Sequence, residues 1–153
     1  ELEKIITYMG KENTVTRSLV RFLVPESREG SIFNLVEAVG RKNVQESFFH
    51  LAKMRRQNEH PLKILAMIIR QFRLLYQIYP MQQRKLSRRE MAASLKVQPF
   101  IIGELLKQAE KYNEATLSKV FLLLKETDYE IKTGKRDGDE ALEQLILKLC
   151  LIT

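Results

Sequence analysis

Apolar residues recur along the chain at the three- and four-residue spacing of amphipathic helices, and we find no convincing strand pattern. The strongest helical pattern covers residues 61–79. At ~100° per residue, its apolar side chains fill nearly half of the circumference and leave a polar strip of Lys63, Arg70, Arg73 and Gln77. A helix this apolar is typical of the centre of a bundle. We therefore predict an all-α fold with this segment at its centre.

Capping residues predict where the helices begin and end. A short polar side chain followed three residues later by Glu is a capping-box pattern. It occurs at Asn43 with Glu46 and at Ser87 with Glu90. Proline favours the first position of a helix, so Pro61 and Pro99 predict two more beginnings. The other predicted boundaries are a cap at Ser31 with an end at Gly40, a helix over 117–133 stopped by Gly134, and a last helix that begins at Asp137 or Asp139.

The weakest point between units is the polar, proline-ended stretch "RRQNEHP" at residues 55–61. A polar linker of this kind often separates two folding units. We place a boundary near residue 58, with a small helical module over residues 1–58 and a larger helical bundle over residues 59–153.

Several apolar side chains are predicted to point away from the core. On the 117–133 helix, Leu122 and Tyr129 lie off the core stripe, and Leu123 lies on the opposite flank. On the last helix, Leu147 and Leu151 lie across from the core stripe. Two interpretations remain open: these residues contact a partner subunit, or they pack against a third helix layer of the same bundle.

Asp128 falls inside the predicted apolar stripe of the 117–133 helix, where an unpaired carboxylate would be costly to bury. Lys132 follows four residues later, in the favoured order of acid before base. We predict a structural ion pair between them rather than a catalytic acid, and Arg70 or Arg73 could also reach Asp128.

The chain is basic in its middle. It has 153 residues, 44% of them hydrophobic, and a net charge of +7. Residues 59–112 contain ten basic and four acidic residues, and the basic ones are densest at Arg84, Lys85, Arg88 and Arg89. These four are candidates to contact a phosphate or an acidic partner. A solvated loop and helix start would explain them equally well.

The sequence contains no recognisable constellation for catalysis, cofactor binding or metal binding. Gly134-Lys135 is not part of a P-loop, because position 129 is Tyr where a glycine is needed and position 136 is Arg instead of Ser or Thr. The two histidines and the single Cys150 form no cluster with zinc spacing. No apolar run approaches the ~18 residues that span a bilayer. We therefore predict no catalytic residue, cofactor, metal or membrane segment.

Residues 87–109, "SRREMAASLKVQPFIIGELLKQA", have the outline of a helix-turn-helix. The second helix turns its apolar arc inward and exposes two lysines and two glutamates, with no Arg or Asn for the usual bidentate base contacts. The turn also carries Lys96 where glycine is common. Sequence-specific DNA reading is therefore disfavoured, although a helix-turn-helix regulator is the alternative function.

Four segments together resemble the delta subunit of bacterial DNA polymerase III. They are "SIFNLVEAVGRKN", "HPLKILAMIIRQFRLL", "QPFIIGELLKQA" and "LSKVFLLLKETDYEIKTGKRDGDEALEQLILKL", and the likeness spans essentially all 153 residues. That subunit belongs to the clamp loader, which places the sliding clamp on primed DNA. The chain also begins with "ELEKIITYMG", without Met and already in helical periodicity, which we interpret as a piece of a longer protein.

The resemblance implies that residues 1–58 are the lid of an AAA+ unit and residues 59–153 a helical collar for subunit association. It implies a non-catalytic scaffold in the bacterial cytoplasm that neither binds ATP nor opens the clamp. Its partners would be the other loader subunits. The sliding clamp would be contacted only through an absent amino-terminal region, and DNA only weakly or indirectly.

Overall fold

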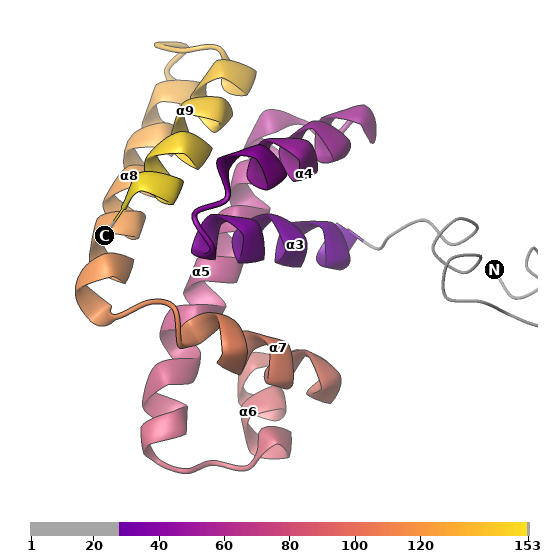
Figure 1. Cartoon of the computed structure of the whole chain (residues 1–153), viewed down its shortest axis with the longest axis vertical. Coiled ribbons are helices and arrows are strands. Elements are labelled where there is room, and N and C mark those ends of the chain that lie inside the picture. The colour runs from indigo at the N-terminus through magenta and orange to yellow at the C-terminus, as the bar shows by residue number, and fades with distance from the viewer. Residues whose placement is uncertain (1–27, 153) are drawn as a thin grey trace, which may run out of the picture.

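The computed structural model describes residues 28–152, with side chains from residue 30 onward. These residues form seven helices and no strand, which confirms the all-α prediction (Figure 1). The first 27 residues of the predicted lid, including the helical pattern at the start of the chain, lie outside the described residues. The helices are α3 (Arg28–Gly40), α4 (Val44–Arg56), α5 (Pro61–Gln83), α6 (Arg88–Leu95), α7 (Pro99–Ala109), α8 (Glu114–Lys132) and α9 (Gly138–Leu151).

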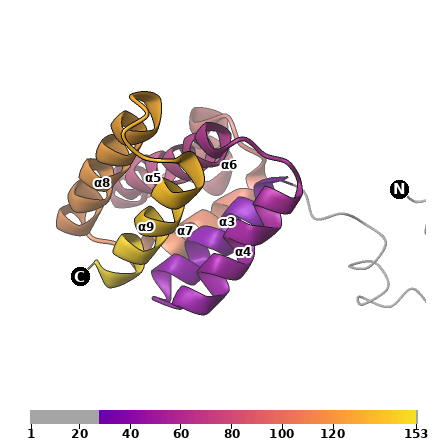
Figure 2. The ribbon, with the colours of Figure 1, turned by 90° about the horizontal axis from the view of Figure 1, so that it is seen from above.

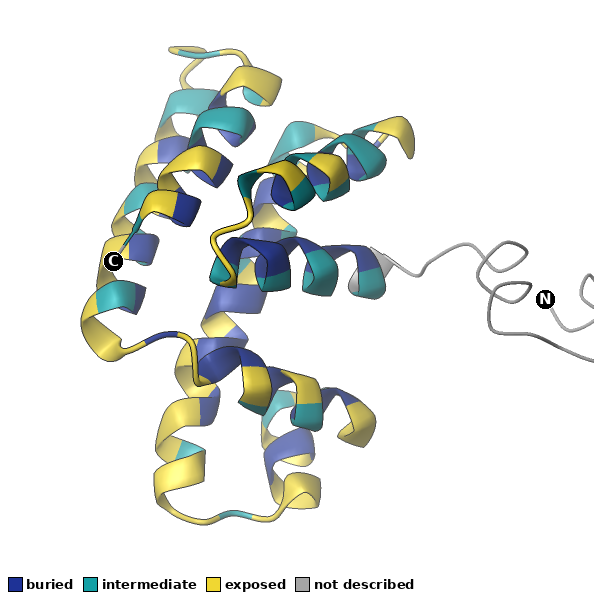
Figure 3. Ribbon diagram, viewed as in Figure 1, coloured by how far each residue is buried: buried dark blue, intermediate teal, exposed yellow. Residues whose placement is uncertain are grey.

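Helix α5 is central, as predicted, because it contacts α3, α6, α7, α8 and α9. Its buried face includes Ile64, Ile68, Phe72 and Leu75, and the predicted polar strip faces solvent. Helices α8 and α9 form a hairpin on one side of α5, α3 and α4 form a second pair, and α6 and α7 cover its carboxyl-terminal half (Figures 1 and 2). Buried positions line the surfaces between these pairs (Figure 3).

The predicted caps at Asn43 and Ser87 are confirmed. The backbone N–H of Glu90 donates to Ser87 Oγ over 3.3 Å, and the backbone N–H of Ser87 donates to Glu90 Oε2 over 2.8 Å. The hydrogen bonds with the Ser87 side chain and backbone lower the pKa of the Glu90 carboxyl group. At Asn43, the side-chain oxygen accepts a hydrogen bond from the backbone N–H of Glu46. The Glu46 carboxylate in turn accepts a hydrogen bond from the side-chain amide of Asn43, where a full capping box would use the Asn43 backbone N–H. Pro61 and Pro99 also begin helices as predicted.

Two predicted beginnings are wrong because an earlier residue starts the helix. Helix α3 begins at Arg28, so Ser31 lies inside it, buried, instead of capping it. Helix α8 begins three residues before Leu117, because the Asn113 side chain accepts from the backbone N–H of Thr116 over 2.8 Å. For the last helix, the open choice is settled in favour of Asp137, which accepts from the N–H groups of Asp139 and Glu140.

Helix α5 does not end at Tyr79, as its sequence pattern suggests, but continues through Pro80 to Gln83. Proline removes one helical N–H and crowds the preceding turn. Tertiary packing holds this last part of the helix, because Ile78 is buried, Met81 packs against the core and α6 contacts α5. Local propensity is therefore overridden by burial.

Helices α3 to α6 are each followed by a non-glycine residue in the left-handed region. These residues are Lys42, Asn58, Lys85 and Lys96, with φ between 53° and 56°. A left-handed residue after a helix allows the chain to close the last turn, as the bond from the Val97 N–H to the Ala92 carbonyl does over 3.1 Å. At Lys96 this geometry forms the turn of the helix-turn-helix without the usual glycine.

Replacing Lys96 by Gly is expected to stabilise the protein by about 0.5–1 kcal/mol, because the steric strain of a left-handed lysine outweighs the added entropy of glycine in the unfolded chain. Urea unfolding followed by circular dichroism measures this change. Lys107→Gly is the matched control, since Lys107 lies within α7 and the same substitution should destabilise there by about 1 kcal/mol. If Lys96→Gly lowers the free energy of unfolding, the left-handed backbone at Lys96 is not strained.

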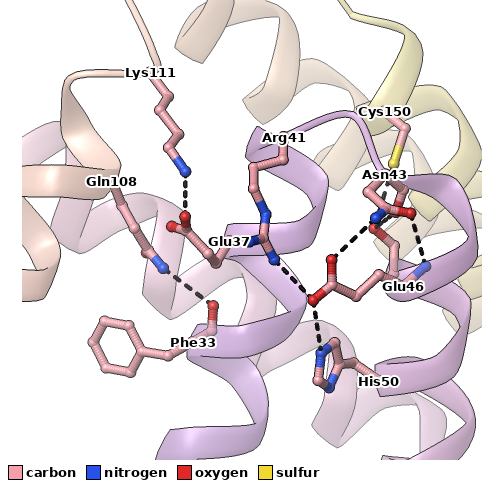
Figure 4. A network of polar contacts seen from close by, with 10 residues as sticks. Phe33, Glu37, Arg41, Asn43, Glu46, His50, Gln108, Lys111 and Cys150 are labelled. Atoms are coloured by element: carbon pink, nitrogen blue, oxygen red, sulfur yellow. Dashed lines mark hydrogen bonds and ion pairs between the residues drawn. The ribbon is translucent and has the colours of Figure 1, made fainter.

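Polar contacts join the helices before residue 58 to those after it (Figure 4). The Gln108 amide donates to the Phe33 carbonyl over 3.1 Å, and Lys111 pairs with Glu37. Across the bundle, Ser47 Oγ lies 3.5 Å from Cys150 Sγ. The buried apolar residues on both sides of residue 58 belong to one cluster. The core is therefore continuous across residue 58, and the division into two modules at this residue stays a prediction.

Helix α7 also buries a polar residue, Gln108, which is only 3% exposed. It accepts a hydrogen bond from the Gln71 amide on α5 over 2.8 Å. Together with the bond to Phe33, this connects α3, α5 and α7 through buried amides. Such amides can be buried because each has a partner.

Candidate functional site

The α8–α9 hairpin exposes four large apolar side chains, all of them predicted to point away from the core. Leu122 is 68% exposed, Tyr129 54%, Leu147 43% and Leu151 68%. We call these four residues the α8–α9 surface. Monomeric domains usually keep exposed apolar groups scattered, and a gathering on one hairpin is typical of an interaction site.

Helical geometry places Leu122 and Leu151 near each other. Glu126 of α8 and Lys148 of α9 form an ion pair across the hairpin, with Nζ and Oε2 separated by 3.9 Å. Leu122 lies one turn before Glu126 and Leu151 nearly one turn after Lys148. Because the helices of a hairpin run in opposite directions, both leucines lie at the same end. Leu123 differs, since it is half-buried and packs against the core.

The predicted pair of Asp128 and Lys132 is present, with Lys132 Nζ donating to Asp128 Oδ2 over 2.7 Å. Asp128 is not inside the core, however, because about a third of its side chain is exposed. Helix α8 is rotated so that Thr127 faces the core, where its hydroxyl donates to the Leu123 carbonyl over 2.9 Å. No bond between Asp128 and either Arg70 or Arg73 is present, although all three line one groove.

The basic cluster of Arg84, Lys85, Arg88 and Arg89 lies at the turn from α5 to α6, and all four residues are exposed. None of them forms an ion pair with a residue in the described part of the chain. The turn projects from the end of the molecule formed by α5 and α6 (Figures 1 and 3). The cluster therefore presents uncompensated positive charge to solvent.

The second helix of the helix-turn-helix outline is a packing element. Ile101, Ile102 and Leu105 of α7 are buried, and α7 contacts both α5 and α6. Its solvent-facing side carries Glu104 and Lys107, whose charges cancel. A recognition helix needs an exposed face with base-reading side chains, which this face does not offer.

The titratable groups of the core are enclosed by the bundle. Burial raises the pKa of the Tyr112 hydroxyl, whose ring packs edge to face against Phe72. Cys150 is buried beside Ser47 and behaves as a small apolar residue.

Within residues 30–152, no three His, Cys, Asp or Glu side chains gather where they could share a metal ion. None of the described helices combines the length and apolar character needed to cross a bilayer.

Sequence reasoning missed Arg55, which joins α4 to α9. Its guanidinium pairs with Glu143 over 2.6 Å and with Asp139 over 2.8 Å. These partners are more than 80 residues away in sequence, so no local pattern signals the contact. The groove between α5 and α8 was also missed, although the polar strip on α5 had identified its arginines as exposed.

Comparison with known proteins assigns the chain. Residues 29–149 match the family model of the DNA polymerase III delta subunit, C-terminal domain. The DNA polymerase III subunit delta of Bacillus subtilis is 34% identical over 149 residues, which cover 97% of this chain and 43% of that protein. The solved structure of the Bacillus subtilis DNA clamp loader delta protein matches with a TM-score of 0.87 and 33% identity, over 98% of this chain and 44% of that one.

The structure thus defines an all-α helical-bundle domain. The chain belongs to the DNA polymerase III delta subunit family and corresponds to its C-terminal domain. It spans less than half the length of the relatives it matches. The alternative of a helix-turn-helix regulator receives no support from these relatives or from the surface of α7.

Proposed function

We propose that this chain is a non-catalytic part of a clamp-loader subunit in the bacterial cytoplasm, and that it holds neighbouring loader subunits in register during DNA replication. The observation that carries the proposal is the α8–α9 surface on a chain of this family. Rigid helices that hold neighbours would transmit ATP-driven changes elsewhere in the loader to the sliding clamp. The clamp itself would be contacted only by a region beyond this chain.

In this proposal, residues 1–58 act as the lid of an AAA+ unit and residues 59–153 as the collar. The partners are other loader subunits, which contact Leu122, Leu123, Tyr129, Leu147 and Leu151. The Asp128–Lys132 pair has a structural role. Arg84, Lys85, Arg88 and Arg89 contact a phosphate or an acidic neighbour and do not read sequence.

The free energy gained by burying the α8–α9 surface is too small for this surface to hold a partner subunit alone. Burying one large apolar side chain contributes about 1.5–3 kcal/mol. Association costs about 4–15 kcal/mol in lost translational and rotational freedom. The four exposed residues would therefore barely hold a partner, and the proposal requires further contact area.

Charge substitution tests the surface. Leu122→Glu combined with Leu147→Glu in the full-length subunit should abolish co-purification with the other loader subunits, because two carboxylates would be buried without partners. Helicity should be unchanged, since both side chains are exposed.

The matched control for this test is Ala93→Glu combined with Phe100→Glu, which adds the same charge at exposed positions of α6 and α7. The control should assemble normally. If the Leu122/Leu147 variant assembles while the control does not, the interface lies on α6–α7. A duplex DNA titration of the fragment completes the test, because only the regulator alternative expects tight, sequence-selective binding.

A further inference from the structure

A groove of about 600 Å³ lies between α5 and α8, and none of its lining residues belongs to the α8–α9 surface. Its floor is apolar and is formed by Leu62, Ala66 and Ile69 of α5 together with Phe121 and Leu124 of α8. Ala66 is exposed, and all the others except Leu124 are partly accessible to solvent. The described helices therefore leave an apolar trough open along the outside of the bundle.

The rim of this groove is cationic. Arg70 and Arg73 line it from α5, and Lys125 and Lys132 line it from α8. Asp128 is the single carboxylate among the lining residues, and it pairs with Lys132. Arg70, Arg73 and Lys125 form no ion pair with any described residue. Three positive charges thus flank the trough without compensation.

The size of the groove matches a short helix. The lining residues run from 62 to 73 on α5 and from 121 to 132 on α8. At ~1.5 Å per residue, each wall is roughly 16 Å long, or about three helical turns. A helix with one apolar face laid into such a groove is a common mode of protein recognition.

The chemistry favours a protein occupant over a nucleic acid. A phosphate backbone would satisfy the arginines but would leave the aliphatic floor uncovered. Bases would need aromatic faces for stacking, and Phe121 is the one aromatic residue that lines the groove. Its ring already packs edge to face with Tyr76, at 6.0 Å between centroids. An apolar helix face flanked by carboxylates would use both the floor and the rim.

We propose that the α5–α8 groove docks an acidic amphipathic helix of about three turns from another subunit of the assembly. The inference rests on the proposed function and adds a second contact to it. Phe121 and Leu122 are adjacent on α8 and project about 100° apart, so the groove and the α8–α9 surface lie on adjoining faces of one helix, with Lys125 where they meet. A subunit between two different neighbours needs two such different surfaces.

Charge reversal at the rim tests the groove. In the full-length subunit, Arg70→Glu with Arg73→Glu should weaken association with the purified loader subunits by at least about tenfold in 0.1 M salt. The difference should shrink in 0.5 M salt, because screening weakens the pairs. Arg56→Glu with Lys107→Glu is the matched control, since it makes the same charge change at exposed positions outside the groove and should leave affinity within about threefold.

A second variant separates shape from charge. Ala66→Trp fills the floor without changing the rim, and it should weaken association while the urea unfolding midpoint is retained, because Ala66 is exposed. A photoreactive amino acid at position 66 should crosslink, within the assembled loader, to a segment that has an apolar face and flanking Asp or Glu residues.

The outcomes separate this inference from the proposed function. If Leu122→Glu with Leu147→Glu abolishes assembly but the groove variants assemble normally, the groove proposal is overturned and the proposed function stands. If the unmodified subunit does not associate with the other loader subunits, the proposed function itself fails. If Arg70→Glu with Arg73→Glu lowers affinity for an oligo-dT strand and leaves assembly intact, the groove binds nucleic acid and the helix-docking proposal is wrong.

Discussion

Replacing Phe72 by Ala should lower the free energy of unfolding by about 3–5 kcal/mol. Phe72 lies near the middle of α5, and its side chain is completely buried. Its ring meets the ring of Tyr112 edge to face, with centroids 5.4 Å apart. The substitution removes this contact and leaves a cavity where α5 meets its neighbours. Urea unfolding monitored by far-UV circular dichroism measures the loss.

Phe100→Ala is the matched control for this prediction. The same atoms are removed, but the Phe100 side chain is 77% exposed, so the expected change is within about 0.5 kcal/mol. Similar unfolding midpoints for the two variants would show that α5 is not the centre of the core.

The buried amides of Gln71 and Gln108 should show strong energetic coupling. Gln108→Leu leaves the Gln71 amide without its partner on α7, and Gln71→Leu leaves the Gln108 oxygen in the same condition. Each single substitution is expected to cost about 1–3 kcal/mol, the penalty for a buried polar group that has lost its hydrogen bond.

The double variant tests this coupling. When both residues are Leu, neither amide remains in the core without its partner. The loss of stability in the double variant should therefore be smaller than the sum of the losses in the two single variants. Urea unfolding of the four proteins completes the thermodynamic cycle. Additive costs would mean that the two amides do not interact in solution.

Features encoded by neighbouring residues were predictable from sequence. The caps at Asn43 and Ser87 and the beginnings at Pro61 and Pro99 follow from side chains that satisfy, or do not need, the first N–H groups of a helix. The centrality of α5 followed from its wide apolar arc. These signals need no knowledge of the rest of the fold.

Features decided by distant packing were not predictable in this way. Helix α5 continues through Pro80 because α6 supports its last turn, and Gln108 is buried because Gln71 and Phe33 provide partners. The exact rotation of α8, which directs Thr127 and not Asp128 toward the core, depends on α9 and α5 together. A helical wheel orders the side chains around one helix but does not contain the positions of the helices that pack against it.

The same limit applies to the candidate sites. The exposure of Leu122, Tyr129, Leu147 and Leu151 follows from their offset from the core stripes of their own helices. The groove needs residues from α5 and α8, whose closeness is a property of the tertiary structure. Sequence therefore identified the surface contained in one hairpin and missed the one formed between distant helices.

The position of α9 has a consequence for the newly made chain. This helix contacts α3, α4, α5 and α8, and it brings Cys150 beside Ser47 and Glu143 beside Arg55, across 103 and 88 residues of sequence. During translation, the apolar faces of these earlier helices have no α9 to cover them until it has left the ribosome. Completion of the bundle therefore waits for α9, and a nascent chain that pauses before α9 exposes surface that chaperones bind.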